Sequence, residues 1–239
     1  MKIEVYPDDD TVARKAAAVI AADMRAAVAV RGRYVMAVSG GHTPWLMLRA
    51  LAGEPLAWQQ VHVVQVDERV APAEDPDRNL AHLRASLLTR VPLPRDHIHA
   101  MPVEAPDLDH AAAQYASTLR DVAGSPPLLD LVHLGLGPDG HTASLVPGDR
   151  ALDVADADVA VAGPYQGRRR MTLTFPIINR SRFVLWLVTG REKAATLVRL
   201  RDGDRSIPAA RVREDRALLL ADRAAAERLG NNEEQEAQK

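Results

Sequence analysis

The chain has 239 residues, enough for one large α/β domain with a sizeable core. Its formal net charge of −2 gives no bulk electrostatic reason to expect a nucleic-acid or anionic-membrane partner, so any anion site has to be built locally. The sequence contains no cysteine, which excludes disulfides, thiolate nucleophiles and cysteine-based metal clusters and fits a reducing compartment.

Targeting and membrane segments are not expected. The N-terminus turns acidic at Asp8 before any apolar stretch long enough for a signal peptide, and no segment reaches the roughly 18 uncharged apolar residues of a membrane span. A cytoplasmic protein with no membrane partner is therefore expected.

Strands and helices are predicted to alternate along the chain. Short apolar runs between turn residues predict strands at residues 3–6, 34–38, 61–66, 97–101, 128–134, 159–162, 171–174, 183–189 and 217–220. Amphipathic stretches predict helices at residues 11–30, 44–51, 78–89, 108–122, 192–200 and 222–229. This alternation indicates an α/β fold, a Rossmann-like, mostly parallel sheet with helices on both faces. Because no linker is visible, residues 1–230 are expected to form a single domain, followed by a frayed tail at residues 231–239.

The first candidate site follows the predicted strand at residues 34–38. In sheets of this kind, ligands bind beyond the carboxyl ends of the strands. Gly40 and Gly41 let the backbone approach a ligand, and a helix with Thr43 as N-cap and Pro44 at its first position presents free N–H groups to an anion such as phosphate. A tight turn with an ordinary threonine cap explains the same residues equally well.

The second candidate site is Asp67-Glu68-Arg69, directly after the predicted strand at residues 61–66. These side chains could bind sugar hydroxyls and supply a fixed cation, and Asn79 could reach the same pocket mouth. Three consecutive charged residues are also typical of a solvated turn, so both interpretations stay open.

The third candidate site is the glycine-rich stretch at residues 135–148. Asp139 and His141 project to the same side of an extended segment, and Gly140 between them permits a bend that brings them together. Histidine can take a proton from water, and a nearby carboxylate can orient its ring. The alternative is a glycine turn in which Asp139 caps a helix beginning near His141. Gly135, Gly137 and Gly140 together exceed what a cap requires.

The fourth candidate site is basic. Arg170, the member of the Arg168–Arg170 triplet nearest to a predicted strand, and Lys193, which opens a helix after Gly190, could clamp a phosphate. Surface solvation explains an arginine triplet as well. His97 and His99 would share a strand face but lack an evident carboxylate partner, so no metal and no other cofactor is expected.

The four sites, in this order, resemble the 6-phosphogluconolactonase family. The resemblance covers most of the chain from about residue 34 to about residue 194. The residues that carry it are Ser39-Gly40-Gly41-His42-Thr43-Pro44, Asp67-Glu68-Arg69, the run from Gly135 to Leu145, Arg170-Met171-Thr172-Leu173-Thr174 with Pro176 and Asn179, and Thr189-Gly190 with Lys193-Ala194. The chain departs from the family pattern at His42 and Arg78, where Ser is frequent, and at Val146, where Phe is common.

The resemblance implies the fold shared with glucosamine-6-phosphate deaminases and ribose-5-phosphate isomerases. It also implies hydrolysis of 6-phospho-D-glucono-1,5-lactone to 6-phospho-D-gluconate, a step of the oxidative pentose phosphate pathway, without a metal. By resemblance, His141 is the general base, Asp139 orients His141 or binds a hydroxyl, and Arg69 stabilises the oxyanion. The residues implied to bind the substrate and its phosphate are Ser39, Gly40, Gly41, Thr43, Asp67, Asn79, Gly137, Arg170 and Lys193.

Two rival functions remain. A deaminase or isomerase is disfavoured because Leu145-Val146-Pro147 stands where the deaminases carry an Asn-Glu-Pro element with an additional carboxylate. A non-catalytic sugar-phosphate sensor would normally carry a DNA-binding unit, and no spare basic segment of that size exists. The sequence does not decide between a monomer and a homodimer.

Overall fold

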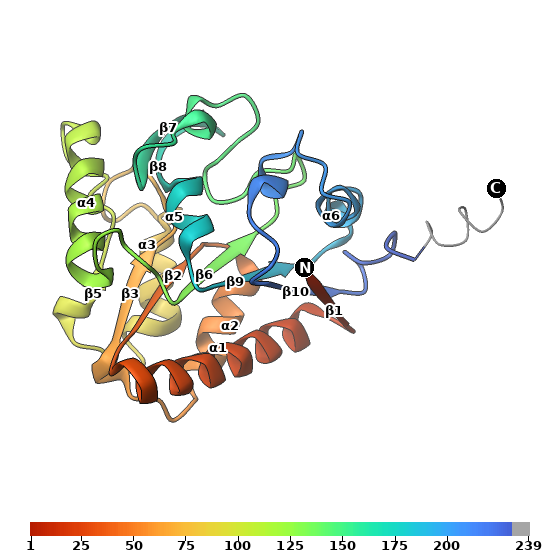
Figure 1. Ribbon diagram of the computed structural model, residues 1–239, viewed down its shortest axis with the longest axis horizontal. Coiled ribbons are helices and arrows are strands. Elements are labelled where there is room, and N and C mark those ends of the chain that lie inside the picture. Colours follow the sequence, from red (N-terminus) through yellow and green to blue (C-terminus); the bar gives the residue numbers. More distant parts are fainter. Residues whose placement is uncertain (231–239) are drawn as a thin grey trace.

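Most strands and helices follow the predicted order in a computed structural model that describes residues 1–230 (Figure 1). The strands are β1 (Lys2–Tyr6), β2 (Tyr34–Val38), β3 (Val61–Gln65), β4 (Asp67–Arg69), β5 (Ile98–His99), β6 (Leu131–Gly135), β7 (Val159–Tyr165), β8 (Arg168–Leu173), β9 (Phe183–Val188) and β10 (Ala217–Asp222). The helices are α1 (Asp9–Arg31), α2 (His42–Ala52), α3 (Asn79–Leu83), α4 (Leu108–Ala123), α5 (Phe175–Arg180) and α6 (Ala194–Arg201). The tail predicted at residues 231–239 lies outside the described residues.

The main sheet is parallel, which confirms the predicted α/β class. Its strands run in the order β1-β10-β9-β6-β2-β3-β5, and each neighbouring pair is parallel. Side chains of a strand point alternately to its two faces, so β2 contributes Val35 and Ala37 to one core and Tyr34, Met36 and Val38 to the other. Helices α1 and α2 cover the second core, and α4 and α6 cover the first.

A small antiparallel sheet sits beyond the carboxyl end of β3. Its strands run in the order β4-β8-β7, so the strands predicted at residues 159–162 and 171–174 belong to a hairpin and not to the parallel sheet. The Leu173 amide donates to the Val66 carbonyl at 2.8 Å, which ties the hairpin to the end of β3. Residues of β4 and β8 are thereby placed at the edge where ligands are expected.

Local differences from the sequence prediction have identifiable causes. Residues 223–229 form turns and not a helix, because the Asp222 carboxylate accepts hydrogen bonds from the amides of Gly190 and Ala225 and bends the chain after β10. The short helix α5 was not predicted, since six residues carry too little periodic signal. Nor does a helix begin near His141, where residues 142–148 form turns and an isolated bridge from Thr142 to Leu145.

Candidate active site

A cleft of about 380 Å³ opens at the carboxyl ends of the central strands. It brings together almost all of the residues singled out in the sequence: Ser39, Gly40, Gly41, Thr43, Asp67, Arg69, Asn79, Gly137, His141, Arg170 and Lys193 line it. Asp139 contacts it through His141. The chain segments that contribute these residues lie far apart in the sequence, and the fold of the two sheets and their loops brings them to one place.

The glycine loop after β2 presents an uncapped helix end to the cleft. Helix α2 begins at His42, after Gly41 with a φ of 132°, and no side chain caps it, so the predicted N-cap role of Thr43 is wrong. The Thr43 hydroxyl instead lies 2.7 Å from the hydroxyl of Thr189, which follows β9. Because the first N–H groups of α2 lack a capping side chain, they remain available to an anion.

Ser39 is anchored to a buried histidine of the central strand β6. Its amide donates to His133 Nδ1 at 3.3 Å, and its hydroxyl donates to the His133 carbonyl at 2.9 Å. Burial lowers the pKa of His133 to about 3, so the ring is neutral at physiological pH. With Nδ1 accepting, the proton is assigned to Nε2. This pair fixes the start of the glycine loop to the middle of the sheet.

Glu68 holds the second candidate segment together through its side chain. Its side chain is fully buried. One carboxylate oxygen accepts hydrogen bonds from the amides of Arg69 and Asn79, each at 2.8 Å, and the other accepts from the Leu80 amide and from Gln65 Nε2. The segment from β4 to α3 is therefore held by one carboxylate and is not a solvated turn.

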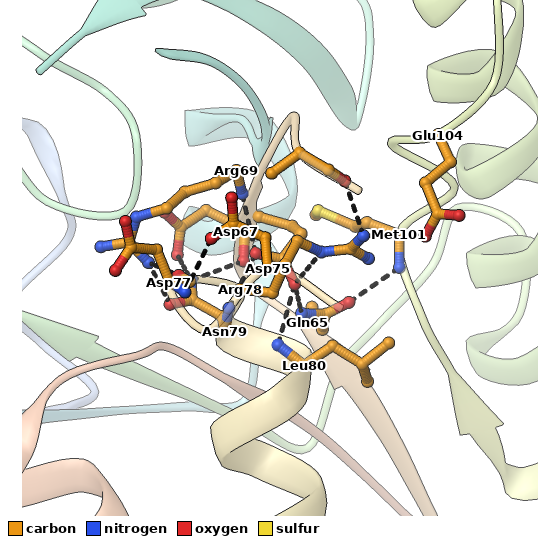
Figure 2. Close-up of polar contacts among 12 residues, drawn as sticks. Gln65, Asp67, Arg69, Asp75, Asp77, Arg78, Asn79, Leu80, Met101 and Glu104 are labelled. Carbon is orange, nitrogen blue, oxygen red and sulfur yellow. Dashed lines mark hydrogen bonds and ion pairs between the residues drawn. The ribbon is translucent and has the colours of Figure 1, made fainter. Parts of the chain in front are cut away.

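Arg78 supplies the positive charge that this buried carboxylate needs. Its Nε lies 3.2 Å from Glu68 Oε2, and its Nη1 donates to the Ala71 carbonyl and to Glu104, as Figure 2 shows. Arg78 is itself buried, with 2% of its surface exposed. Arg78, which departs from the family pattern, thus connects Glu68, Ala71 and Glu104 at the base of the loop over residues 70–78.

The polar groups of this segment face the cleft. Arg69 Nη1 donates to the Asp77 carbonyl at 2.8 Å and to Asn79 Oδ1 at 2.7 Å, which leaves its other N–H groups for a ligand. Asn79 lies against Gly40, where an added Cβ would come within 2.0 Å of Asn79 Oδ1. Asp67 accepts from the Ser144 hydroxyl at 2.7 Å, and burial raises the pKa of its carboxyl.

Asp139 and His141 form a hydrogen-bonded pair. Asp139 Oδ1 lies 2.6 Å from His141 Nδ1 and also accepts from the His141 amide at 3.1 Å. Burial acts to raise the pKa of Asp139, but these hydrogen bonds bring it below its ordinary value. With Nδ1 carrying a proton that it donates to Asp139, Nε2 is the basic nitrogen, and no group in residues 1–230 is hydrogen-bonded to it. The His141 imidazole lies directly against Gly137, and a Cβ added to this glycine would come within 2.0 Å of Nδ1.

Two further cations, Arg170 and Lys193, line the cleft. Arg170 of β8 is buried with its Nε unpartnered, and its nearest carboxylate, Asp67, is 3.9 Å away. Arg168 instead pairs with Asp75 at 2.6 Å. Lys193 lies after Gly190, 3.9 Å from Glu192. A buried guanidinium with weak protein contacts is prepared to bind an anion.

Sequence reasoning missed several residues at or near the cleft. His133 lies in an apolar strand run where one polar residue gives no signal of its contact with Ser39. Tyr165, in the hairpin, contacts His141, although the sequence separates the two by 24 residues. Glu192 lines the cleft beside Lys193.

Within residues 1–230, no group of three or more His, Asp or Glu side chains is arranged to hold a metal ion. None of the helices in this part of the chain has the length and apolar character that a membrane span requires.

Fold and cleft together define a Rossmann-like α/β protein whose pocket is lined by cations and by an uncapped helix end, beside the hydrogen-bonded Asp139–His141 pair. Residues 7–220 match the family model described as glucosamine-6-phosphate isomerases/6-phosphogluconolactonase. The chain is 38% identical to the 6-phosphogluconolactonase of Mycobacterium tuberculosis over 241 residues, covering 95% of this chain and 98% of that protein. The chain therefore belongs to this family of enzymes.

Solved structures agree with this assignment. The crystal structure of 6-phosphogluconolactonase from Thermotoga maritima superposes with a TM-score of 0.83 at 26% identity, covering 92% of this chain and 98% of that one. A monomeric glucosamine-6-phosphate deaminase, at 19% identity and a TM-score of 0.84, covers 95% of this chain and 100% of its own and shares the fold. The similarity to the deaminase fold expected from the sequence is confirmed.

Proposed function

We propose that this chain hydrolyses 6-phospho-D-glucono-1,5-lactone to 6-phospho-D-gluconate by direct attack of water. The observation that carries the proposal is the 2.6 Å hydrogen bond between Asp139 Oδ1 and His141 Nδ1, which leaves Nε2 basic at the wall of a cleft that also contains Arg69, Arg170 and Lys193. The names of relatives such as the M. tuberculosis protein support the choice of substrate.

The proposed reaction begins at His141. Its Nε2 takes a proton from a water molecule as the water oxygen attacks the lactone carbonyl, and the C=O electron pair moves to the carbonyl oxygen. When the tetrahedral intermediate collapses, the C1–O5 ring bond breaks, and His141 returns the proton to the ring oxygen. Asp139 holds the ring in the required tautomer and stabilises the imidazolium that forms transiently.

Arg69 is the proposed partner of the developing oxyanion. Its Nη1 is committed to Asp77 and Asn79, so the guanidinium is fixed before substrate arrives, and Nη2 is not committed. A fixed donor in a site that excludes water contributes on the order of 3 kcal/mol to the transition state. We propose that Asp67 and Asn79 bind sugar hydroxyls on the same wall.

The phosphate is proposed to lie at the start of α2. The free N–H groups after Gly40 and Gly41, the hydroxyls of Ser39 and Thr43, and the cations of Arg170 and Lys193 would hold it. Binding of this distant group orients the lactone against His141 and contributes to turnover through positioning. Neither a metal nor another cofactor takes part in the proposed mechanism.

The test is to mix purified protein with freshly generated lactone and follow its loss against spontaneous hydrolysis, for the parent and for His141→Ala. We expect acceleration by the parent and its near-complete loss in the variant. Glucosamine 6-phosphate serves as the control substrate, because its conversion would favour the deaminase alternative. Equal turnover by the parent and His141→Ala would disprove the role of the base.

A further inference from the structure

Tyr165 lies against the Asp139–His141 pair although no motif contains it. It is the last residue of β7, and it pairs across the hairpin with Arg168. Its ring meets the His141 imidazole edge-on, with centroids 5.1 Å apart and an angle of 61° between the planes. Tyr165 is partly buried and does not itself line the cleft. Tyr165 therefore acts on the cleft through the lining residues that it contacts.

The hydroxyl of Tyr165 has one acceptor suited to its proton. It lies 3.5 Å from His141 Nδ1, but the proton on Nδ1 already points to Asp139 at 2.6 Å, so Nδ1 cannot accept. The remaining acceptor beside it is the Asp139 carboxylate, which is bound to the same His141 Nδ1 and whose charge acts on the Tyr165 hydroxyl. Burial and the Asp139 charge both raise the pKa of Tyr165, so the hydroxyl stays a donor at neutral pH.

The ring of Tyr165 also contacts the buried cation of the cleft. The Arg170 guanidinium carbon lies 5.3 Å from the ring centroid, within the range of a cation–π contact. The other partners of Arg170 are distant, with Gln166 at 3.4 Å and Asp67 at 3.9 Å. Tyr165 is thus the side chain that touches both the pair at the reacting end and a cation of the anion site.

We propose that Tyr165 is a positioning residue: its hydroxyl fixes the Asp139 carboxylate toward His141 Nδ1, and its ring sets the place of the imidazole relative to Arg170. The expected effect of Tyr165 on turnover rests on the lactonase activity proposed above. The expected effect on the tautomer of His141 does not, because it concerns the protein without substrate.

The two parts of the contact can be separated by substitution. Tyr165→Phe removes the hydroxyl and keeps the ring beside Arg170, whereas Tyr165→Leu removes both. Tyr6→Phe is the matched control, because the Tyr6 hydroxyl donates to the Glu4 carboxylate at 2.6 Å on β1, away from the cleft. The variants are compared as full-length, folded proteins with matching circular dichroism spectra.

The first readout is the tautomer of His141. In 15N-histidine-labelled protein, long-range 1H–15N spectra identify which ring nitrogen carries the proton, and His141→Ala assigns the signal. We expect the Nδ1-protonated form in the parent and in Tyr6→Phe, and a mixture of both tautomers in Tyr165→Phe, because the freed carboxylate no longer holds one orientation. An unchanged tautomer in Tyr165→Phe would overturn the proposal, whether or not the protein hydrolyses the lactone.

The second readout is the separate effect of each substitution on kcat and on KM. Tyr165→Phe is expected to lower kcat about 3- to 10-fold with KM within about twofold of the parent, and Tyr165→Leu is expected to raise KM as well, since Arg170 loses its support. A parent that fails to hydrolyse lactone while Tyr165→Phe shifts the tautomer would refute the proposed function and keep this inference. A fall in kcat without a tautomer change would make the hydroxyl part of the chemistry and overturn the positioning role.

Discussion

Glu68 and Arg78 form an ion pair inside the protein, with Arg78 Nε 3.2 Å from Glu68 Oε2 and both side chains almost fully buried. The same carboxylate binds the amides of Arg69 and Asn79, two residues proposed to contact substrate. A buried charge with several donors is costly to disturb, because removing the charge leaves those donors without their acceptor. Cleft geometry and stability therefore depend on one carboxylate.

Glu68→Gln should destabilise the protein and weaken catalysis together. The amide NH₂ group would face N–H donors that now meet an oxygen, so the free energy of unfolding should fall by about 3 kcal/mol. Urea denaturation measures this loss. Glu104→Gln is the control, because Glu104 binds the same arginine from an exposed position and should change stability by less than about 1 kcal/mol. Similar losses in the two variants would contradict the central role of Glu68.

Lys193→Ala should raise KM for the lactone with little change in kcat. A charge-assisted hydrogen bond to phosphate is worth roughly 1.5–3 kcal/mol, so an increase of about 10-fold or more is expected. Arg191→Ala is the matched control, because Arg191 is two residues away, exposed, and paired with Glu227 outside the cleft. Steady-state kinetics at two salt concentrations checks the assignment. A fall in kcat alone would place Lys193 at the reacting end.

The sequence predicted the sheet and the residues of the cleft better than it predicted their contacts. Periodic apolar runs identify strands such as β9, and strand ends identify ligand sites, because both signals are local. The cap of α2 was predicted wrongly, since Thr43 bonds Thr189 across 146 residues of chain, and no local pattern encodes such a contact.

The hairpin of β7 and β8 shows the same limit. Its strands were recognised, but their place in a separate antiparallel sheet depends on pairing with the three residues of β4. The contacts of Tyr165 with His141 and Arg170 follow from that pairing. Residue types and spacing predict that Asp139 and His141 lie together, whereas the contacts of Tyr165 with this region depend on long-range pairing that no local pattern encodes.

His133 should make the protein less stable as the pH falls. Its pKa is about 3 in the folded protein and about 6.5 in an unfolded chain, so the unfolded state binds the proton first. The stabilising contribution is complete above pH 6.5 and is lost at about 1.4 kcal/mol per pH unit as the pH falls toward 3. Urea denaturation between pH 7 and 4 should show a shallower dependence in His133→Gln than in the parent. Parallel curves for the two proteins would argue against a buried neutral ring.

Gly137→Ala should abolish catalysis by displacing the base. A Cβ at this position would lie 2.0 Å from His141 Nδ1 and 2.7 Å from Asp139 Oδ1, so the imidazole has to leave its place. We expect turnover to fall at least about 100-fold, since a misplacement of about 1 Å carries that cost. Gly53→Ala is the control, because its Cβ would meet only the Ala50 carbonyl oxygen at 3.4 Å, an ordinary contact at the end of α2. Lactone hydrolysis and the 15N spectrum of His141 are measured on both variants. Parent-like turnover in Gly137→Ala would mean that catalysis does not need the His141 ring in its place against this glycine. The assignment of His141 as the base in its observed position would then fail.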